Sequence, residues 1–283
     1  MRRTVPGSLA FAVALLVAAP AARADQWSKT FTVSAMPHLA LEADNASLSI
    51  SPGADGHVAV VVTTSGWQIP KDVHVIESQT GNDINIQVKQ QQHWFSFSNG
   101  STSVAITVPS QANLDVSTGN GAVTLGAITG TLRAGTGNGR IEATGARGDV
   151  YLHTGNGRIG GSGLDGSFEA RTGNGAVRVS GRFDGLQIDS GRGQVQATAL
   201  SGSKMASDWR VGTGVGDVTV SLPSNFSAEL SGSTGVGHVT VDFPVTVSGS
   251  LAGSSVRGRL GQGGRTLRVQ TGVGSIHIER TTV

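Results

Sequence analysis

The chain of 283 residues contains no cysteine, only one tyrosine and few charged residues, which make up 14% of it. Without cysteine it has neither disulfides nor thiolate metal sites, so its stability must come from packing or repetition. Hydrophobic residues account for 37% of the chain, which is enough to build a core, but a thin one. Beyond the N-terminus, no segment is apolar enough to cross a membrane.

The N-terminus has the three parts of a secretory signal peptide. Two arginines precede an apolar run over residues 9–19, and Ala22-Arg23-Ala24 supplies a cleavage site of small residues. We expect residues 1–24 to be cleaved and the protein to be exported, either to the periplasm or to the cell surface and beyond. Removing these residues removes three arginines and no acid, which leaves 18 basic and 19 acidic residues. The basic isoelectric point is therefore no sign of nucleic-acid binding.

Glycine is abundant, with 42 residues, and many of them fall in a repeat. Thr-Gly-Asn-Gly occurs four times, with its threonine at positions 118, 136, 154 and 172, and Ser190-Gly-Arg-Gly continues the step of 18. Later copies read Thr-Gly-Val-Gly and begin at Thr213, Thr234 and Thr271. The long last step predicts one more degenerate copy near residues 256–260. A constant period of this kind is typical of repeat architectures.

Apolar and polar residues alternate around each copy, as they do in half-buried strands. With a step of 18, apolar residues align in columns, for example Leu114, Leu132, Val150, Phe168 and Leu186. One repeat buries too little apolar surface to fold alone, so the copies must stack. We predict an all-β fold: a single-stranded parallel β-solenoid, similar to a β-helix, with rungs of about 18 residues and an N-terminal β cap.

We expect the repeated turn to be structural. Its two glycines allow a sharp corner through positive φ, and asparagines of successive copies can hydrogen-bond to one another as a ladder. After residue 200, valine replaces this asparagine, and either the chain or a partner must cover the apolar edge; we favour the chain. The turn residues are Gly119, Asn120, Gly121, Gly137, Asn138, Gly139, Gly155, Asn156, Gly157, Gly173, Asn174 and Gly175.

Residues 25–110 are β-patterned but irregular, and residues 44–50 resemble a degenerate repeat. We interpret residues 25–110 as an N-terminal β-rich cap, because an uncapped stack exposes strand edges that pair with other chains. The glycine-rich solenoid repeats then occupy residues 111–283. Their C-terminal edge, residues 275–283, is expected to be exposed and open to self-association.

The Thr-Gly-Asn-Gly and Thr-Gly-Val-Gly copies, together with segments 243–249, 257–261 and 267–276, resemble a bacterial family of exported β-strand-repeat proteins. This family is labelled adhesin or adhesin-like and is built on a domain of unknown function. The resemblance covers roughly residues 40–283. It implies a non-enzymatic adhesion or cell-envelope module, and it supplies no catalytic residue.

The outward face of the repeats holds the best candidate binding residues, which are Arg133, Tyr151, His153, Glu169 and Arg171. A tyrosine beside an arginine and a carboxylate can hold a sugar, and His153 can act as a base. The alternative to an adhesin is therefore a carbohydrate-active β-helix enzyme that uses the Tyr151/His153/Arg171 face.

A simpler interpretation is that this face is a solvated sheet decorated with charge pairs. In it, Asp115 pairs with Arg133 and Arg171 with Asp189 across neighbouring rungs. We favour this interpretation over an enzyme, because short rungs leave no long loops to build an active site. Only the insertion at residues 201–208 is long enough to reach outward.

No metal site or cofactor is expected. The seven histidines never occur at ligand spacing, and the glycine-rich turns join strand to strand, without the helix that a phosphate loop requires. Basic and acidic residues are nearly balanced along the repeats, so nucleic acid is not expected as a partner. The expected partner is a protein or a glycan at the cell envelope.

Overall fold

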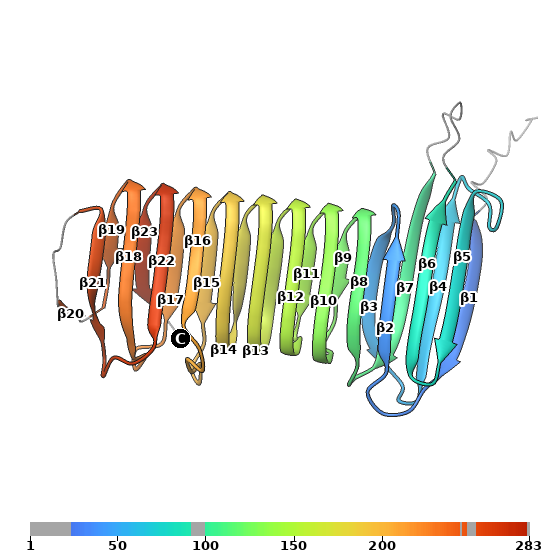
Figure 1. The fold of residues 1–283 in the computed structure, drawn as a ribbon, viewed down its shortest axis with the longest axis horizontal. Coiled ribbons are helices and arrows are strands. Elements are labelled where there is room, and N and C mark those ends of the chain that lie inside the picture. The colour runs from blue at the N-terminus through green and yellow to red at the C-terminus, as the bar shows by residue number, and fades with distance from the viewer. Residues whose placement is uncertain (1–23, 92–99, 244, 248–252, 282–283) are drawn as a thin grey trace, which may run out of the picture.

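The computed structural model describes residues 24–91, 100–243, 245–247 and 253–281, so residues 1–23 of the expected signal peptide lie outside it. The described residues form 23 strands, which confirms the prediction of an all-β chain. The strands lie side by side in a long stack, with the N-terminal strands at one end (Figure 1). Among the described residues, no helix has the length and apolarity that crossing a bilayer requires.

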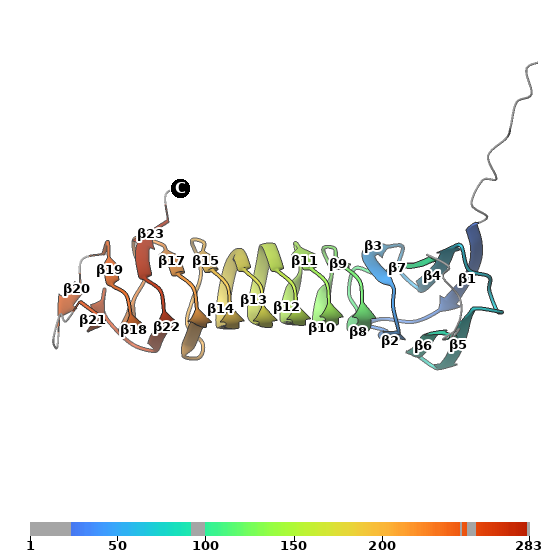
Figure 2. The ribbon, with the colours of Figure 1, turned by 90° about the horizontal axis from the view of Figure 1, so that it is seen from above.

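The stack has two layers of strands, as the view from above shows (Figure 2). We call the layer that carries Tyr151 the Tyr151 face and the other layer the opposite face. Starting from the N-terminal end, the strands of the Tyr151 face are β5 (Val73–Thr80), β6 (Asp83–Gln90), β2 (His38–Ala43), β8 (Asn113–Asn120), β10 (Thr129–Asn138), β12 (Arg147–Asn156), the second halves of β13 (Ile159–Asn174) and β14 (Val177–Arg192), β16 (Trp209–Val215), β22 (Thr266–Val273), β18 (Ala228–Val236), β21 (Ser255–Leu260) and β20 (Val245–Val247).

The opposite face is built in the same way. In the same direction, its strands are β1 (Ala24–Thr32), β4 (His57–Ser65), β7 (Ser101–Pro109), β3 (Ser47–Gly53), β9 (Val123–Leu125), β11 (Ile141–Thr144), the first halves of β13 and β14, β15 (Val195–Ala199), β17 (Val218–Leu222), β23 (Ile276–Arg280) and β19 (Val239–Val241). One strand of each face, joined by a corner, makes up what we call a rung.

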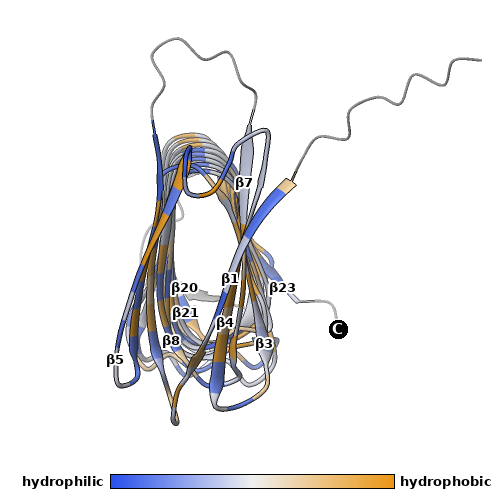
Figure 3. Cartoon of the chain, turned by 90° about the vertical axis from the view of Figure 1, so that its right-hand side faces the viewer, coloured by the Kyte–Doolittle hydropathy of each residue, from blue (hydrophilic) through white to orange (hydrophobic). Residues whose placement is uncertain are grey.

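In the middle of the stack, neighbouring strands run parallel with an offset of 18 residues. Leu132 lies opposite both Leu114 and Val150 on the Tyr151 face, and Ile141 lies opposite Val123 and Ile159 on the other. Because side chains alternate along a strand, these residues all point between the two layers and are buried. The end-on view shows how narrow the space between the layers is (Figure 3).

Aromatic side chains fill the core where the rungs become longer. Trp209 is fully buried, with its ring 6.3 Å from that of Phe183 and 5.1 Å from that of Phe226. These rungs include the insertion at residues 201–208, which raises the offset between β14 and β16 to 23 residues, as between Ile188 and Val211. The larger rings occupy the extra space, since a protein core tolerates few voids.

A buried hydroxyl ties each corner to the next one. Thr136 Oγ1 donates a hydrogen bond to the carbonyl oxygen of Gly121, and Thr154 Oγ1 donates one to that of Gly139, both at 2.9 Å. The equivalent bonds are made by Thr172, Ser190, Thr213, Thr271 and Thr234. All of these side chains are buried. A threonine or serine is accommodated at the corner because its buried hydroxyl finds a hydrogen-bond acceptor in this carbonyl group.

The corner glycines are required because successive rungs approach closely. A β-carbon on Gly155 would lie 2.6 Å from the carbonyl oxygen of Gly137, and one on Gly157 would overlap the carbonyl of Gly139. Positive φ occurs only at the second glycine of the motif, and not in every copy: Gly121 has 149° and Gly175 has 159°, whereas Gly139 and Gly157 lie outside this region. The expectation that both glycines take positive φ is wrong for the first one, which is needed for space.

The corner asparagines form a polarised ladder on the outside of the stack. Each amide nitrogen donates to the amide oxygen of the preceding rung, at 2.8–2.9 Å for the last three asparagines. The ladder runs from Asn174 through Asn156, Asn138, Asn120 and Asn45 to Gln90. Since Asn45 and Gln90 belong to residues 25–110, this region continues the stack, and β2 and β3 pair in parallel with β8 and β9.

The C-terminal strands lie inside the stack, between the rung of β16 and β17 and the rung of β18 and β19. Thr271 donates to Gly216, and Thr234 donates to Gly274, both at 2.8 Å. The expectation that the C-terminal edge is exposed and mediates self-association is therefore wrong, because β23 is hydrogen-bonded on both sides, by β17 and β19. Residues 256–260 are not a parallel repeat either, since β21 runs antiparallel to β18.

The valines at the later corners stay exposed, contrary to the expectation that the chain covers them. Val215 and Val273 are 48% and 49% exposed, and Val236 is 66% exposed. The three lie in register, so they form a short apolar row that continues the line of the asparagine ladder. Among the described residues no segment covers them, because the C-terminal residues enter the stack as a rung.

We predict that Gly155→Ala destabilises the protein by about 1–3 kcal/mol, because the added carbon meets the Gly137 carbonyl of the adjacent rung. Gly135→Ala is the matched control, since a β-carbon there has its nearest neighbours at 3.9 Å. Thermal unfolding followed by circular dichroism measures both variants. Equal melting temperatures for the two would contradict the close-approach explanation.

We also predict that Thr154→Val lowers stability by about 1 kcal/mol, because the buried bond to the Gly139 carbonyl is lost while the shape is kept. In a domain of this size the melting temperature should fall by roughly 2–4 °C. Thr144→Val, at an exposed strand position, is the control and should change little. If both variants melt alike, the corner hydroxyl contributes no net stability.

Candidate binding groove

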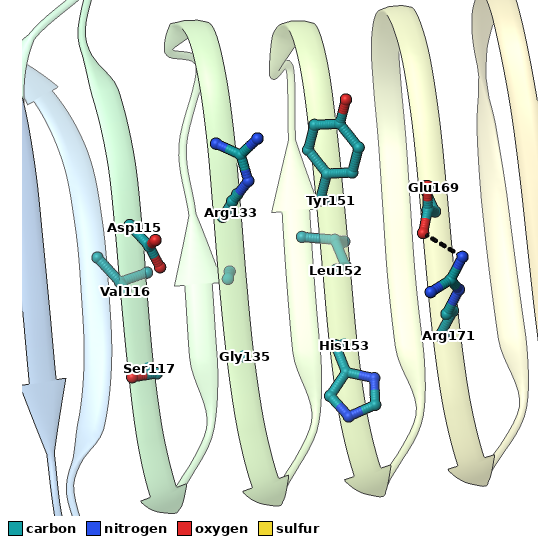
Figure 4. A pocket seen from close by; sticks show the side chains of 11 residues that line it. Asp115, Val116, Ser117, Arg133, Gly135, Tyr151, Leu152, His153, Glu169 and Arg171 are labelled. Carbon is teal, nitrogen blue, oxygen red and sulfur yellow. Dashed lines mark ion pairs between the residues drawn. The ribbon is translucent and has the colours of Figure 1, made fainter.

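An open groove crosses the Tyr151 face over strands β8, β10, β12 and β13. Its volume is about 270 Å³. The strands supply alternate residues to its two walls, because outward side chains occur at every second position (Figure 4). One wall contains Asp115, Arg133, Tyr151 and Glu169, and the other contains Ser117, Gly135, His153 and Arg171.

Gly135 creates the depression in the second wall. It lies in register between Ser117 and His153, so a side chain is missing there from an otherwise continuous row. A β-carbon at this position would meet no atom closer than 3.9 Å. Packing therefore does not require a glycine here, in contrast to the corners. Because Gly135 has no side chain, the second wall of the groove is open at this point.

Two contacts orient the functional groups of the groove. The guanidinium of Arg133 lies over the ring of Tyr151, 4.9 Å from its centre, in the arrangement of a cation–π interaction. Arg171 forms an ion pair with Glu169 of its own strand, at 2.9 Å (Figure 4). His153, Arg133 and Arg171 are exposed, whereas Tyr151 and Glu169 are half-buried.

The expected charge pairs across rungs do not form. Arg133 turns to the Tyr151 ring, so Asp115 has no ion-pair partner among the described residues. Asp189 lies 3.8 Å from Arg210 of the following strand rather than pairing with Arg171. Because exposed pairs gain little energy, the choice among neighbouring partners depends on local geometry. The groove therefore keeps one carboxylate, that of Asp115, unpaired.

A second hollow, of about 150 Å³, lies on the other side of Tyr151 and Glu169. Gly185 leaves space in its floor, and Ser207 and Asp208 of the insertion form one wall. Tyr151 and Glu169 thus stand as a ridge between two hollows that together follow the stack. Asp208 is fixed in place, because its Oδ1 accepts a hydrogen bond of 2.9 Å from the backbone nitrogen of Thr266.

The groups with displaced pKa values lie outside this groove. A hydrogen bond and the charge of Arg182 lower the pKa of Asp165, and Asp165 raises the pKa of Arg182 in return. Near the N-terminal end, the hydrogen bond to Glu42 raises the pKa of Lys89, although burial opposes it. Both are ion pairs between strands of the exposed surface, and their residues do not line the groove.

All five binding residues proposed from the sequence line the same groove. Their role in binding stays a prediction. The repeat pattern did not single out Ser117 and Gly135, or Ser167, Gly185 and Gln187 of the second hollow. A signal was present: outward glycines interrupt columns in which other rungs carry polar side chains. Within the described ranges, no three histidine, aspartate or glutamate side chains come together as a metal site.

The arrangement offers the groups that carbohydrates require. A half-buried aromatic ring provides an apolar platform, while the arginines and carboxylates beside it can form paired hydrogen bonds with neighbouring hydroxyl groups. The groove is open along its length and lies on rigid strands. It therefore fits an extended ligand better than a small molecule, which usually binds in an enclosed pocket.

Comparison with solved structures finds chains that are weakly similar and cover most of this protein. A "putative cell adhesion protein" from Clostridium sporogenes ATCC 15579 is 14% identical, with a TM-score of 0.31, over 90% of this chain and 100% of that one. A "putative adhesin" from Bacteroides fragilis NCTC 9343 is 11% identical, with a TM-score of 0.45, over 89% and 96%. A "putative lipid binding protein" from Parabacteroides distasonis ATCC 8503 is 10% identical, with a TM-score of 0.22, over 91% and 97%.

A search of curated proteins finds no match. The family model described as Toastrack DUF4097 matches residues 36–279, which include nearly all of the described strands. The match begins just before β2 and ends in β23, so it takes in both ends of the parallel stack. The resemblance drawn from the repeated turns is thereby confirmed, and the chain belongs to the Toastrack DUF4097 family.

Proposed function

We propose that the protein is an exported, non-enzymatic binding module of the cell envelope, and that it holds a glycan in the groove of the Tyr151 face. The observation that carries this proposal is the convergence of Tyr151, Arg133, Glu169 and Arg171 on one open groove. Aromatic and charged side chains on a rigid scaffold are the usual components of a recognition site.

The scaffold in this proposal is a parallel β-solenoid of 18-residue rungs, with residues 25–110 as its N-terminal cap. The parallel register of β8 to β14 supports the rungs. At the N-terminal end, Lys29 of β1 and Glu77 of β5 form an ion pair of 2.8 Å that bridges the two faces. This bridge supports a capping role, because it joins the two outermost strands across the end of the core.

A binding role is preferred to catalysis because of how the charged groups are held. Glu169, the carboxylate nearest to Tyr151 along the wall, is already paired with Arg171. The groove is also open to solvent, whereas catalytic sites gain much of their power by excluding water. Export rests on the signal sequence in residues 1–24, and the glycan would then be met in the periplasm or at the cell surface.

Glycan-array binding tests the proposal. The purified protein should bind a defined set of glycans, and Tyr151→Ala should weaken that binding at least about tenfold, because a central aromatic anchor is lost. Arg171→Ala should also weaken binding, since it removes the donor and leaves Glu169 without its partner. Arg178→Ala, at an exposed position of the opposite face, is the control and should bind as the unchanged protein does.

Two results would refute the proposal. Absence of binding to any glycan would remove the recognition role, as would equal binding by Tyr151→Ala and Arg178→Ala. Mass spectrometry of the bound glycans after incubation checks the non-enzymatic part. Cleavage products that depend on His153 would instead support the carbohydrate-active enzyme.

A further inference from the structure

A row of arginines continues the groove toward the C-terminal end of the Tyr151 face. Gln187 lines the second hollow, and the parallel register places Arg210 of β16 directly beside it. Arg268 of β22 lies directly beside Arg210 in turn. Two strands further, Arg257 of β21 occupies the same line, opposite Ser231 of β18. All three arginines are exposed.

Like charges that lie directly opposite each other on neighbouring strands are unfavourable. Some exposed arginines of this stack do meet acids: Arg182 pairs with Asp165, and Arg259 pairs with Glu229 at 3.0 Å. In the row, Arg210 has only the 3.8 Å contact with Asp189, and Arg268 has no carboxylate partner among the described residues. The fold itself therefore leaves positive charge unneutralised at this point.

The surroundings of the row leave room for a ligand. Gly212 lies beside Arg210 on the same strand, and the outward positions next to Arg268 and Ser231 are Gln270 and Ser233. None of these side chains is charged or bulky enough to cover the guanidinium groups. Each guanidinium presents donors in a planar fork, which matches the two oxygens of an acidic group.

We propose that the glycan held in the groove is acidic, and that Arg210 and Arg268 bind its carboxylate or sulfate groups. This inference rests on the proposed function. Adjacent strands are about 4.8 Å apart, so the row begins roughly 14 Å from Tyr151 and reaches Arg268 at roughly 19 Å. A ligand that contacts both Tyr151 and the row must therefore be an oligosaccharide, with its acidic groups several sugar units from the ring.

The test compares acidic glycans with neutral glycans of the same backbone, for example oligogalacturonate with its methyl ester, on an array that also carries sulfated and sialylated probes. The unchanged protein should bind the acidic members of such pairs about tenfold more tightly or better, and rising salt should reduce this preference. The variant Arg210→Gln/Arg268→Gln should lose the preference and still bind the neutral members.

The matched control is Arg158→Gln/Arg178→Gln, which removes the same charge from two exposed residues away from the Tyr151 face: Arg158, just before β13, and Arg178 of β14. It should keep the acidic preference, so an effect of net charge alone is excluded. The inference is overturned if only neutral glycans bind, or if Arg210→Gln/Arg268→Gln retains the preference. If the unchanged protein binds no glycan at all, the result is a different one, because it refutes the proposed function itself.

Discussion

The hydrogen bond from a buried corner hydroxyl to the glycine carbonyl of the neighbouring rung is the interaction on which this structure depends. It recurs from Thr136 to Thr271 with nearly constant length. The bond requires that the corners of successive rungs approach so closely that no β-carbon fits between them, which is why glycine flanks it. Once the corners are stacked in this way, the strands on both sides are brought into register, and apolar side chains are placed over apolar side chains.

This constraint also determines what the surface can do. Outward side chains are held in straight columns at the spacing of the strands. Each one therefore lies directly beside the equivalent side chains of the rungs before and after it. The groove arises in this way, from one tyrosine, an absent side chain at Gly135 and the charged residues around them. The row that includes Arg210 and Arg268 lies in the same column as Tyr151. Recognition along such a face is naturally linear, which is why we propose an extended glycan as the ligand.

Much of the fold and of the candidate site could be predicted because the repeat is local and regular. Residues 18 apart were expected to be neighbours, and this alone placed Arg133, Tyr151, His153, Glu169 and Arg171 on one surface. The interaction partners within that surface could not be predicted, because an exposed charged side chain has several neighbours with which it could pair at similar interaction energy. In the structure, Arg133 lies over the Tyr151 ring, and Arg171 forms an ion pair with Glu169. The second hollow was missed because its wall comes from the insertion at residues 201–208, which has no counterpart in other rungs.

The sequence by itself determined the β class, the alternation of buried and exposed positions, the stacking corner and the family, because each of these depends on residues that are close in the chain or at a constant period. Only the tertiary structure decided the order of the rungs at the two ends. β2 and β3 enter the stack after β6 and β7, and β22 and β23 enter before β18 and β19. The reason is that parallel rungs of similar apolar pattern can stack in any order. The order that forms leaves antiparallel strands at the ends, and only the packing of the complete chain selects it.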